Sequence, residues 1–184
     1  KGRKLKEDKK ITMREIPYMA VLNVQDKQLN LDQVKTIAVT EEEIEKFRLS
    51  LDDLLLTEGG DPDKLGRGTI WKGEIKECIH QNHIFRVRAK SKNLNMEYIS
   101  WLISSEYGKK YFLRCAKQTT GIATINKTQL KEFPVLLPSD NQLQRFQKLM
   151  TNLNTTQNNM NKANQLFKNL VESMSASHLK SKEK

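Results

Sequence analysis

Two carboxylates and a lysine in the first half of the chain have a spacing that could support metal-dependent hydrolysis. Asp63 follows a proline, and Glu74 precedes Lys76 by two residues. Two such carboxylates could hold Mg²⁺, and the lysine could position or activate a water molecule. This chemistry requires Asp63 and Glu74 on adjacent strands, whereas the glycines around Asp63 predict a loop. A metal-dependent nuclease is therefore kept only as an alternative of a different class.

Two histidines and a cysteine lie close together in the order Cys78, His80, His83. On a strand, His80 and His83 would point to opposite faces, which makes joint ligation of zinc difficult. Gln81 and Asn82 between them favour a hydrogen-bonding turn that either supports the fold or contacts a ligand. We expect no metal here, and we expect both Cys78 and the distant Cys115 to be buried, reduced thiols.

Other catalytic signatures are missing from the sequence. The glycines at 59–60, 66 and 68 form neither a P-loop nor a dinucleotide fingerprint, because the closing lysine and hydroxyl are absent. No motif for binding S-adenosylmethionine occurs, and no serine lies in a nucleophile elbow. The sequence predicts a non-catalytic protein.

The charge of the 184 residues is +10, and it is segregated along the chain. Residues 16–61 carry four Lys or Arg against ten Asp or Glu, whereas residues 62–131 carry fourteen against five. An acidic block beside a basic block indicates one basic face, as expected of a nucleic-acid binder, although a solvated basic surface would give the same counts. Residues 1–10 are predicted to be a basic arm or linker.

The hydrophobic pattern up to Pro138 predicts an α+β domain, assigned to residues 11–138. Tyr98, Trp101, Leu102, Tyr107 and Phe112 are core candidates in the long helical segment, which Gly108 could divide. Strands are expected at 16–24, 34–39, 54–56, 69–75, 83–89 and 133–137, helices at 40–47, 95–116 and 128–132, and polar loops at 58–68 and 118–124. The helix at 40–47 is expected to begin with a capping box between Thr40 and Glu43.

Residues 139–184 are predicted to form one long helix with a frayed basic tail, because no Gly or Pro follows Pro138. A helix of about 38 residues would be roughly 57 Å long, so its apolar stripe needs another helix to cover it. A coiled coil is favoured over a helix folded back on its own domain. The stripe comprises Leu143, Phe146, Met150, Leu153, Met160, Phe167, Leu170 and Met174.

Three strings in order, LLLTEGGDPDKLGRGTIWKGEI, CIHQNHIFRVR and KQTTGIATINKTQLKEFPVLLP, closely resemble the target recognition domain of type I restriction-modification specificity subunits. The long C-terminal helix resembles the spacer helix that follows each such domain. The usual PPLxEQ segment before that helix is replaced here by residues 138–142, which keep only the first Pro and the Gln. The family normally carries two recognition domains and two spacer helices, so the chain corresponds to half a subunit.

The resemblance implies a non-catalytic component that binds one half of a bipartite DNA target through the major groove. Its implied partners are double-stranded DNA, two modification subunits, restriction subunits, and a second specificity half paired through the long helix. S-adenosylmethionine, ATP and Mg²⁺ would belong to the partner subunits, and this chain would carry no cofactor. The implied location is the cytoplasm of a bacterium or archaeon, with no membrane association. A third hypothesis is an inhibitor that occupies the modification subunit through the helix without recognising DNA.

Within this family likeness, basic side chains would neutralise phosphates, while amides and hydroxyls would face base edges. Because the three strings are shared across proteins that recognise different targets, base choice is expected in other stretches, such as 25–30 or 90–95. The expected DNA-contacting residues are Lys64, Arg67, Lys72, His80, Gln81, Asn82, Arg86, Arg88, Lys117, Gln118, Thr119, Thr120, Lys127 and Lys131.

Overall fold

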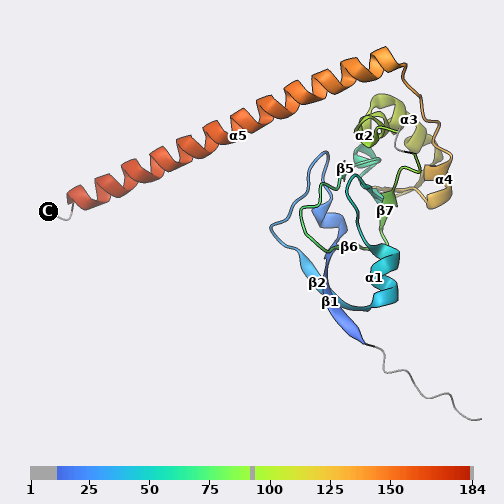
Figure 1. Cartoon of the computed structure of the whole chain (residues 1–184), viewed down its shortest axis with the longest axis horizontal. Coiled ribbons are helices and arrows are strands. Elements are labelled where there is room, and N and C mark those ends of the chain that lie inside the picture. Colours follow the sequence, from blue (N-terminus) through green and yellow to red (C-terminus); the bar gives the residue numbers. More distant parts are fainter. Residues whose placement is uncertain (1–11, 92–93, 183–184) are drawn as a thin grey trace, which may run out of the picture. The chain divides into compact units, whose positions relative to one another are not determined.

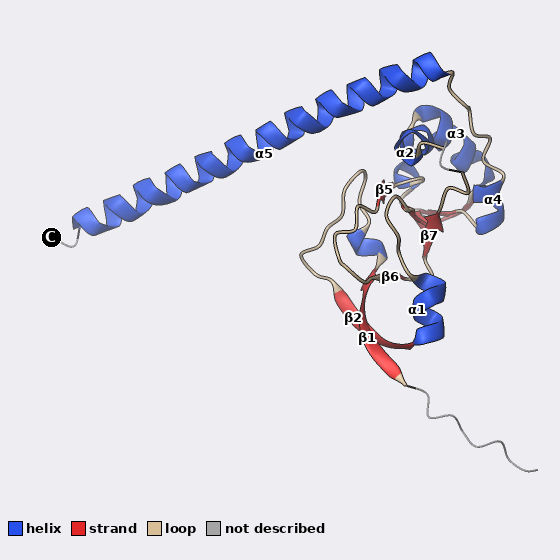
Figure 2. Ribbon diagram, in the orientation of Figure 1, coloured by secondary structure: helices blue, strands red, loops and turns tan. Residues whose placement is uncertain are grey.

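The computed structural model describes residues 12–91 and 94–182, except for the side chains of Asp63 and of residues 176–182. The chain divides into two compact units, one through Leu136 and one from Leu137 onward. The first unit mixes short strands with short helices, and the second is a single long helix, so the mixed α/β fold is confirmed (Figures 1 and 2).

The strands are β1 (Met13–Met19), β2 (Lys35–Thr40), β3 (Leu54–Thr57), β4 (Gly59–Gly60), β5 (Gly68–Ile70), β6 (Ile79–His80), β7 (Ile84–Val87), β8 (Lys117–Thr119) and β9 (Ile122–Thr124). The helices are α1 (Glu41–Phe47), α2 (Met96–Ser104), α3 (Glu106–Cys115), α4 (Lys127–Lys131) and α5 (Asp140–Lys182), with 3-10 turns at Val21–Asn23 and Pro62–Lys64.

Three small sheets organise the first unit, with strand orders β2-β1-β6, β5-β3-β7 and β4-β9-β8. Every residue of β3 is buried, because this strand lies between β5 and β7 and is covered on both faces. Its side chains alternate between two cores, as the period of two requires. Leu54 and Leu56 pack in one cluster with α2 and α3, whereas Leu55 packs in another with Trp71.

The larger core joins β3 and β5 to the helices. Phe112 of α3 is fully buried, and its ring stacks on that of Phe133 at 5.2 Å between centroids. Tyr111 meets both rings edge-on, which is the arrangement that aromatic quadrupoles favour. Two of the expected core residues are corrected: Trp101 and Tyr107 are 38% and 36% exposed.

Helix starts follow the expected capping chemistry. Thr40 and Glu43 form the predicted capping box at the start of α1. The break in the segment 95–116 lies at Ser105, which caps α3, and not at Gly108 as expected. Gly108 lies inside α3, where an added Cβ would be 2.0 Å from the Ile103 carbonyl oxygen. The glycine therefore permits close approach of two helices and does not interrupt one.

Several expected boundaries differ from the structure. The strand expected at 16–24 runs from Met13 to Met19 and is followed by the 3-10 turn at Val21–Asn23. Segment 118–124 is a hairpin of β8 and β9 with Gly121 at a φ of 78° in the turn, and segment 58–68 contributes β4 to the same sheet. β5 ends at Ile70, well before residue 75. Segment 133–137 is not a strand, since the carbonyls of Pro134 and Leu136 accept hydrogen bonds from Tyr107 and Tyr98.

The second unit contains the long helix that the sequence predicts. α5 runs for 43 residues, and Ser139 with Gln142 forms a capping pattern at its start. Its middle is rich in Asn and Thr, which are poor helix formers. Thr151, Thr155 and Thr156 direct their hydroxyls to carbonyls four residues earlier. No helix in the described ranges combines the length and apolarity needed to cross a membrane.

Candidate nucleic-acid interface

Two of the arginines expected to contact phosphate are engaged inside the domain. Arg88 donates to both carboxylate oxygens of the buried Asp53 at 2.6 Å, and also to the Ser50 hydroxyl at 3.0 Å. Arg86 donates to the carbonyl oxygens of Lys46 and Arg48 at 3.2 and 2.6 Å. These bonds join β7 to the α1–β3 connection. The guanidinium groups thereby have a structural role, and their contact with DNA remains a prediction.

The amide- and imidazole-rich run lies at the end of β6. Asn82 and His83 are the central residues of a turn closed by a hydrogen bond from the Ile84 amide to the Gln81 carbonyl. His80 packs edge-on against Phe47, and burial lowers its pKa. His83 pairs with Glu58 at 2.9 Å. Asn82 and His83 are exposed, whereas His80 and Gln81 are half-buried, so the turn presents one amide and one imidazole to solvent.

The β8–β9 hairpin presents most of the second predicted group. Lys117, Gln118, Thr119 and Thr120 are all exposed, although Gln118 donates to the Leu113 carbonyl at 3.2 Å. The hairpin is extended by β4, where Gly59 pairs with Thr124. An added Cβ on Gly59 would be 2.6 Å from the Thr124 methyl group, so only glycine allows this approach. The hydroxyl and amide groups are thus held on a short sheet and not on a free loop.

A set of cations near this hairpin has no carboxylate partner among the described residues. We call it the basic cluster; it comprises Lys109, Lys110, Arg114, Lys117, Lys127 and Lys131. Helices α3 and α4 pack together, since Gln129 of α4 donates to the Cys115 carbonyl and Tyr111 of α3 donates to the Gln129 carbonyl. Lys117 begins β8, two residues after the end of α3. All of its members are exposed except Lys109, which is half-buried. Unpaired charge of this kind can attract the phosphates of a nucleic acid.

Lys109, Lys110 and Arg114 were not among the expected DNA-contacting residues. The sequence feature that could have predicted them is the amphipathic pattern of α3. Phe112 is buried on one side of this helix, while Lys110 and Arg114, four residues apart, are exposed on another.

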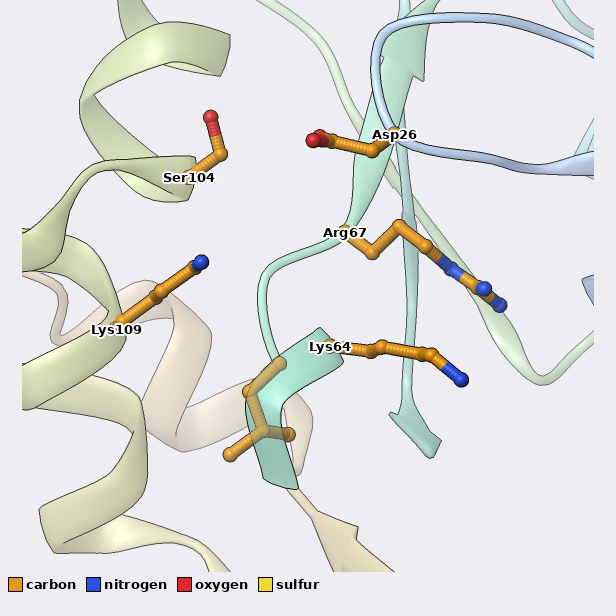
Figure 3. A pocket seen from close by; sticks show the side chains of 6 residues that line it. Asp26, Lys64, Arg67, Ser104 and Lys109 are labelled. Carbon is orange, nitrogen blue, oxygen red and sulfur yellow. The ribbon is translucent and has the colours of Figure 1, made fainter. Parts of the chain in front are cut away.

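A small cavity of about 90 Å³ lies between the 3-10 turn and helices α2 and α3, lined by Asp26, Lys64, Leu65, Arg67, Ser104 and Lys109. We call it the notch. Asp26 and Lys109 direct their charged ends into it, whereas Lys64 and Arg67 extend away side by side (Figure 3). The Ser104 hydroxyl instead donates to the carbonyls of Ser100 and Trp101 on its own helix. Lys64 pairs with Asp61, and Arg67 donates to the Gln25 side chain at 3.3 Å. The Nε of Arg67 is buried without a hydrogen-bond partner in the described structure.

The residues that the sequence suggested for metal binding do not come together in the described structure. The side chain of Asp63 lies outside the described residues, and the carboxylate of Glu74 accepts a hydrogen bond from the Lys72 amide. Lys72 is exposed and its Nζ lies 3.9 Å from Glu97. Burial raises the pKa of Cys78 to about 12. Among the described residues, no three potential ligands of a metal ion come together.

The long helix carries exposed apolar side chains along its length. Leu153, Met160, Phe167, Leu170 and Met174, all predicted for the seam, are between 47% and 69% exposed. Leu149, Leu166 and Val171, which were not predicted for the seam, are exposed as well. They widen the stripe and follow the same spacing of three and four residues. The other three predicted seam residues are less exposed, since Leu143 and Phe146 are half-buried and Met150 is buried.

The chain is similar to known proteins of one family. The family model described as "Type I restriction modification DNA specificity domain" matches residues 1–168. A putative type I restriction enzyme MjaX specificity subunit of Methanocaldococcus jannaschii is 21% identical over 147 residues, covering 79% of this chain and 35% of that protein. The StySPI specificity subunit of Salmonella potsdam is 24% identical over 169 residues, covering 88% and 36%.

These features define a DNA specificity domain. The chain belongs to the type I restriction-modification DNA specificity family, whose model covers most of its length. It spans about a third of the length of the curated relatives that it matches.

Proposed function

We propose that the globular unit recognises one half of a bipartite DNA target and that α5 sets the distance to the other half. The family match, which extends through the globular unit and most of α5, carries this proposal. In it, residues 11–138 form the recognition domain and residues 139–184 the spacer helix. The basic cluster and the β8–β9 hairpin supply phosphate contacts and polar groups for the major groove.

The helix supports a pairing role on physical grounds. A run of 43 residues with Asn and Thr at its centre has little helical propensity of its own, and long helices in water depend on packing of an apolar face. The exposed apolar residues from Leu153 to Met174 supply such a face. Its occupant is the equivalent helix of a second specificity half. Two copies of this chain would present identical half-sites related by a twofold axis, and so would recognise a palindromic, interrupted target.

The remaining partners follow from the same proposal. Modification subunits would dock on the specificity component and methylate adenine with S-adenosylmethionine, and restriction subunits with ATP and Mg²⁺ would join them. This chain would bind none of these cofactors and would act in the cytoplasm of a bacterium or archaeon.

The decisive experiment is methylome sequencing of a host that expresses the chain together with its cognate modification subunit. We expect a two-part motif with methylated adenine, interrupted by a fixed number of unspecified base pairs. The matched control expresses the modification subunit alone. A methylome without a bipartite motif, obtained with a soluble and assembled complex, would contradict the proposal and favour a helix-borne inhibitor.

A further inference from the structure

The turn at Gln25–Gln28 is unusually well fixed for a surface segment. The Gln25 amide donates to the Gln28 carbonyl at 3.0 Å, and Val24 and Leu29 form an antiparallel bridge below it. At its base, the buried Asn23 side chain donates to the carbonyls of Asn30 and Gln33 at 2.8 and 3.1 Å. These bonds leave the turn little freedom to move independently of the domain.

Lys27 fixes the turn from the other side. Its φ of 59° is in the left-handed region, which a non-glycine residue occupies only when its surroundings require it. Its amide donates to the Gly68 carbonyl at 2.9 Å. Its ammonium donates to the carbonyl and hydroxyl oxygens of Ser100 at 2.7 and 2.9 Å and lies 5.0 Å from the Trp101 ring centroid. The charge therefore points into the domain, where it cannot act as a phosphate contact.

Gln28 is the exposed amide of this turn. Gln25 is occupied, since its oxygen accepts from Arg67 and its nitrogen donates to the Leu22 carbonyl at 2.7 Å. Gln28 is exposed, and no side-chain partner is found for it among the described residues. The turn thus offers a free donor and acceptor pair on a rigid support.

The neighbours of the turn are cationic. Asp26 lines the notch together with Lys64, Arg67 and Lys109, and its carboxylate faces the end of Lys109 across the cavity (Figure 3). Phosphate contacts fix the position of a protein on duplex DNA, and base choice then comes from polar groups that reach the base edges beside them. A rigid polar turn beside cations has this arrangement.

We propose that the Gln25–Gln28 turn is a base-recognition element, in which the Gln28 amide pairs with an adenine in the major groove and Lys27 is a positioning residue. A glutamine amide matches the N6 donor and N7 acceptor of adenine. The inference rests on the proposed function, because it assigns a specificity-determining residue to the same DNA-binding unit.

The test is selection of duplexes from a randomised pool by the full-length chain, followed by sequencing of the bound fraction. Wild type is compared with Gln28→Ala and with Gln33→Ala, a matched change of an exposed amide outside the turn. We expect Gln28→Ala to lose preference for adenine at one position by about 5- to 100-fold. Preferences elsewhere should be kept, and Gln33→Ala should match wild type.

The variant Lys27→Met tests whether Lys27 positions the turn or contacts a phosphate itself. We expect the same loss of preference at the Gln28 position, a circular dichroism spectrum like that of wild type, and an unchanged salt dependence of DNA affinity. A salt slope lowered by about one unit would show that Lys27 contacts a phosphate and would overturn its positioning role.

The outcomes also distinguish this inference from the proposed function. If the wild-type chain enriches no sequence, DNA recognition itself fails and the inference fails with it. If wild type enriches a sequence that Gln28→Ala selects with equal stringency, only the inference is overturned. The inference is also overturned if Gln28→Ala keeps its DNA selection but binds the modification subunit more weakly, because the turn then serves a protein partner.

Discussion

Arg88 and Asp53 form a bidentate ion pair in which the Asp53 carboxylate is fully buried and the Arg88 side chain is half exposed. Each carboxylate oxygen of Asp53 accepts a hydrogen bond of 2.6 Å from the Arg88 guanidinium. The Asp53 side chain has no exposed surface, whereas the Arg88 side chain is 49% exposed. The Ser50 amide also donates to this carboxylate, at 2.7 Å. The bond to Asp53 raises the pKa of Arg88. The pair closes the loop before β3 and fixes the end of β7.

Replacing Arg88 with alanine should therefore destabilise the fold. The change leaves the Asp53 carboxylate buried with only the Ser50 amide as partner, and we expect a loss of about 2–3 kcal/mol in the free energy of unfolding. Urea denaturation followed by circular dichroism measures it. At temperatures where the variant stays folded, the salt slope of DNA binding should equal that of wild type. A slope reduced by about one unit would instead assign Arg88 to phosphate binding, as expected from the sequence.

Alanine substitutions at Gly59 and Gly60 form a matched pair that tests the close approach of β4 and β9. Gly59→Ala introduces a methyl group 2.6 Å from the Thr124 Cγ2 and 2.9 Å from the Ala123 carbonyl oxygen, whereas Gly60→Ala meets nothing within 4 Å. We expect Gly59→Ala to cost about 1–3 kcal/mol in thermal or urea unfolding and to weaken DNA binding by displacing the hairpin. Gly60→Ala should stay close to wild type in both measurements. Equal effects of the two changes would argue against the close approach.

The basic cluster should determine the salt dependence of DNA affinity. Lys117→Ala with Lys127→Ala should lower the slope of log affinity against log salt by up to about 0.9 for each phosphate that the variant no longer neutralises. Fluorescence anisotropy of a labelled duplex at several salt concentrations measures the slope. The control is Lys35→Ala, which removes an exposed charge from β2 in a different sheet. A slope lowered by the control and unchanged by the double variant would locate the interface elsewhere.

The stripe on α5 should control self-association. Leu153→Glu places a charge on the stripe, and we expect it to raise the concentration at which the chain dimerises by at least about tenfold, or roughly 1.4 kcal/mol. Thr155→Glu is the matched control, because two residues correspond to about 200° around a helix and so place the charge on the opposite side. Light scattering over a concentration series distinguishes them. A wild-type chain that stays monomeric at high micromolar concentration would contradict the pairing.

Lys27 should produce a pH dependence of stability at alkaline pH. Burial lowers its pKa from 10.5 to about 8. Between these values the unfolded chain binds more protons than the folded chain, so the free energy of unfolding should rise with pH in this window because of Lys27. Below about pH 8 the residue is protonated in both states and contributes no slope. The measurement is the difference in urea stability between wild type and Lys27→Met at pH 7.5–10. A difference that is independent of pH would contradict the assignment.

Local features of the sequence determined the boundaries of several elements. The Thr40–Glu43 capping box, the apolar run 54–56 and the long helix after Pro138 were predicted from residues that interact with near neighbours or recur at a fixed period. The three family strings identified the family, and the segregated charge was compatible with DNA binding without deciding it. Each of these signals is contained within a short stretch of chain, so the sequence alone suffices to detect it.

The tertiary structure decided which charges are free and which are engaged. Arg88 and Lys117 belong to similar basic strings, yet only the first lies beside a buried carboxylate, and that carboxylate is 35 residues away in the chain. Likewise, nothing near Lys27 in sequence indicates that its ammonium reaches Ser100, 73 residues later. Such pairings depend on how strands and helices pack, because burial and distance, more than residue type, determine whether a charge stabilises the fold or remains available to a ligand.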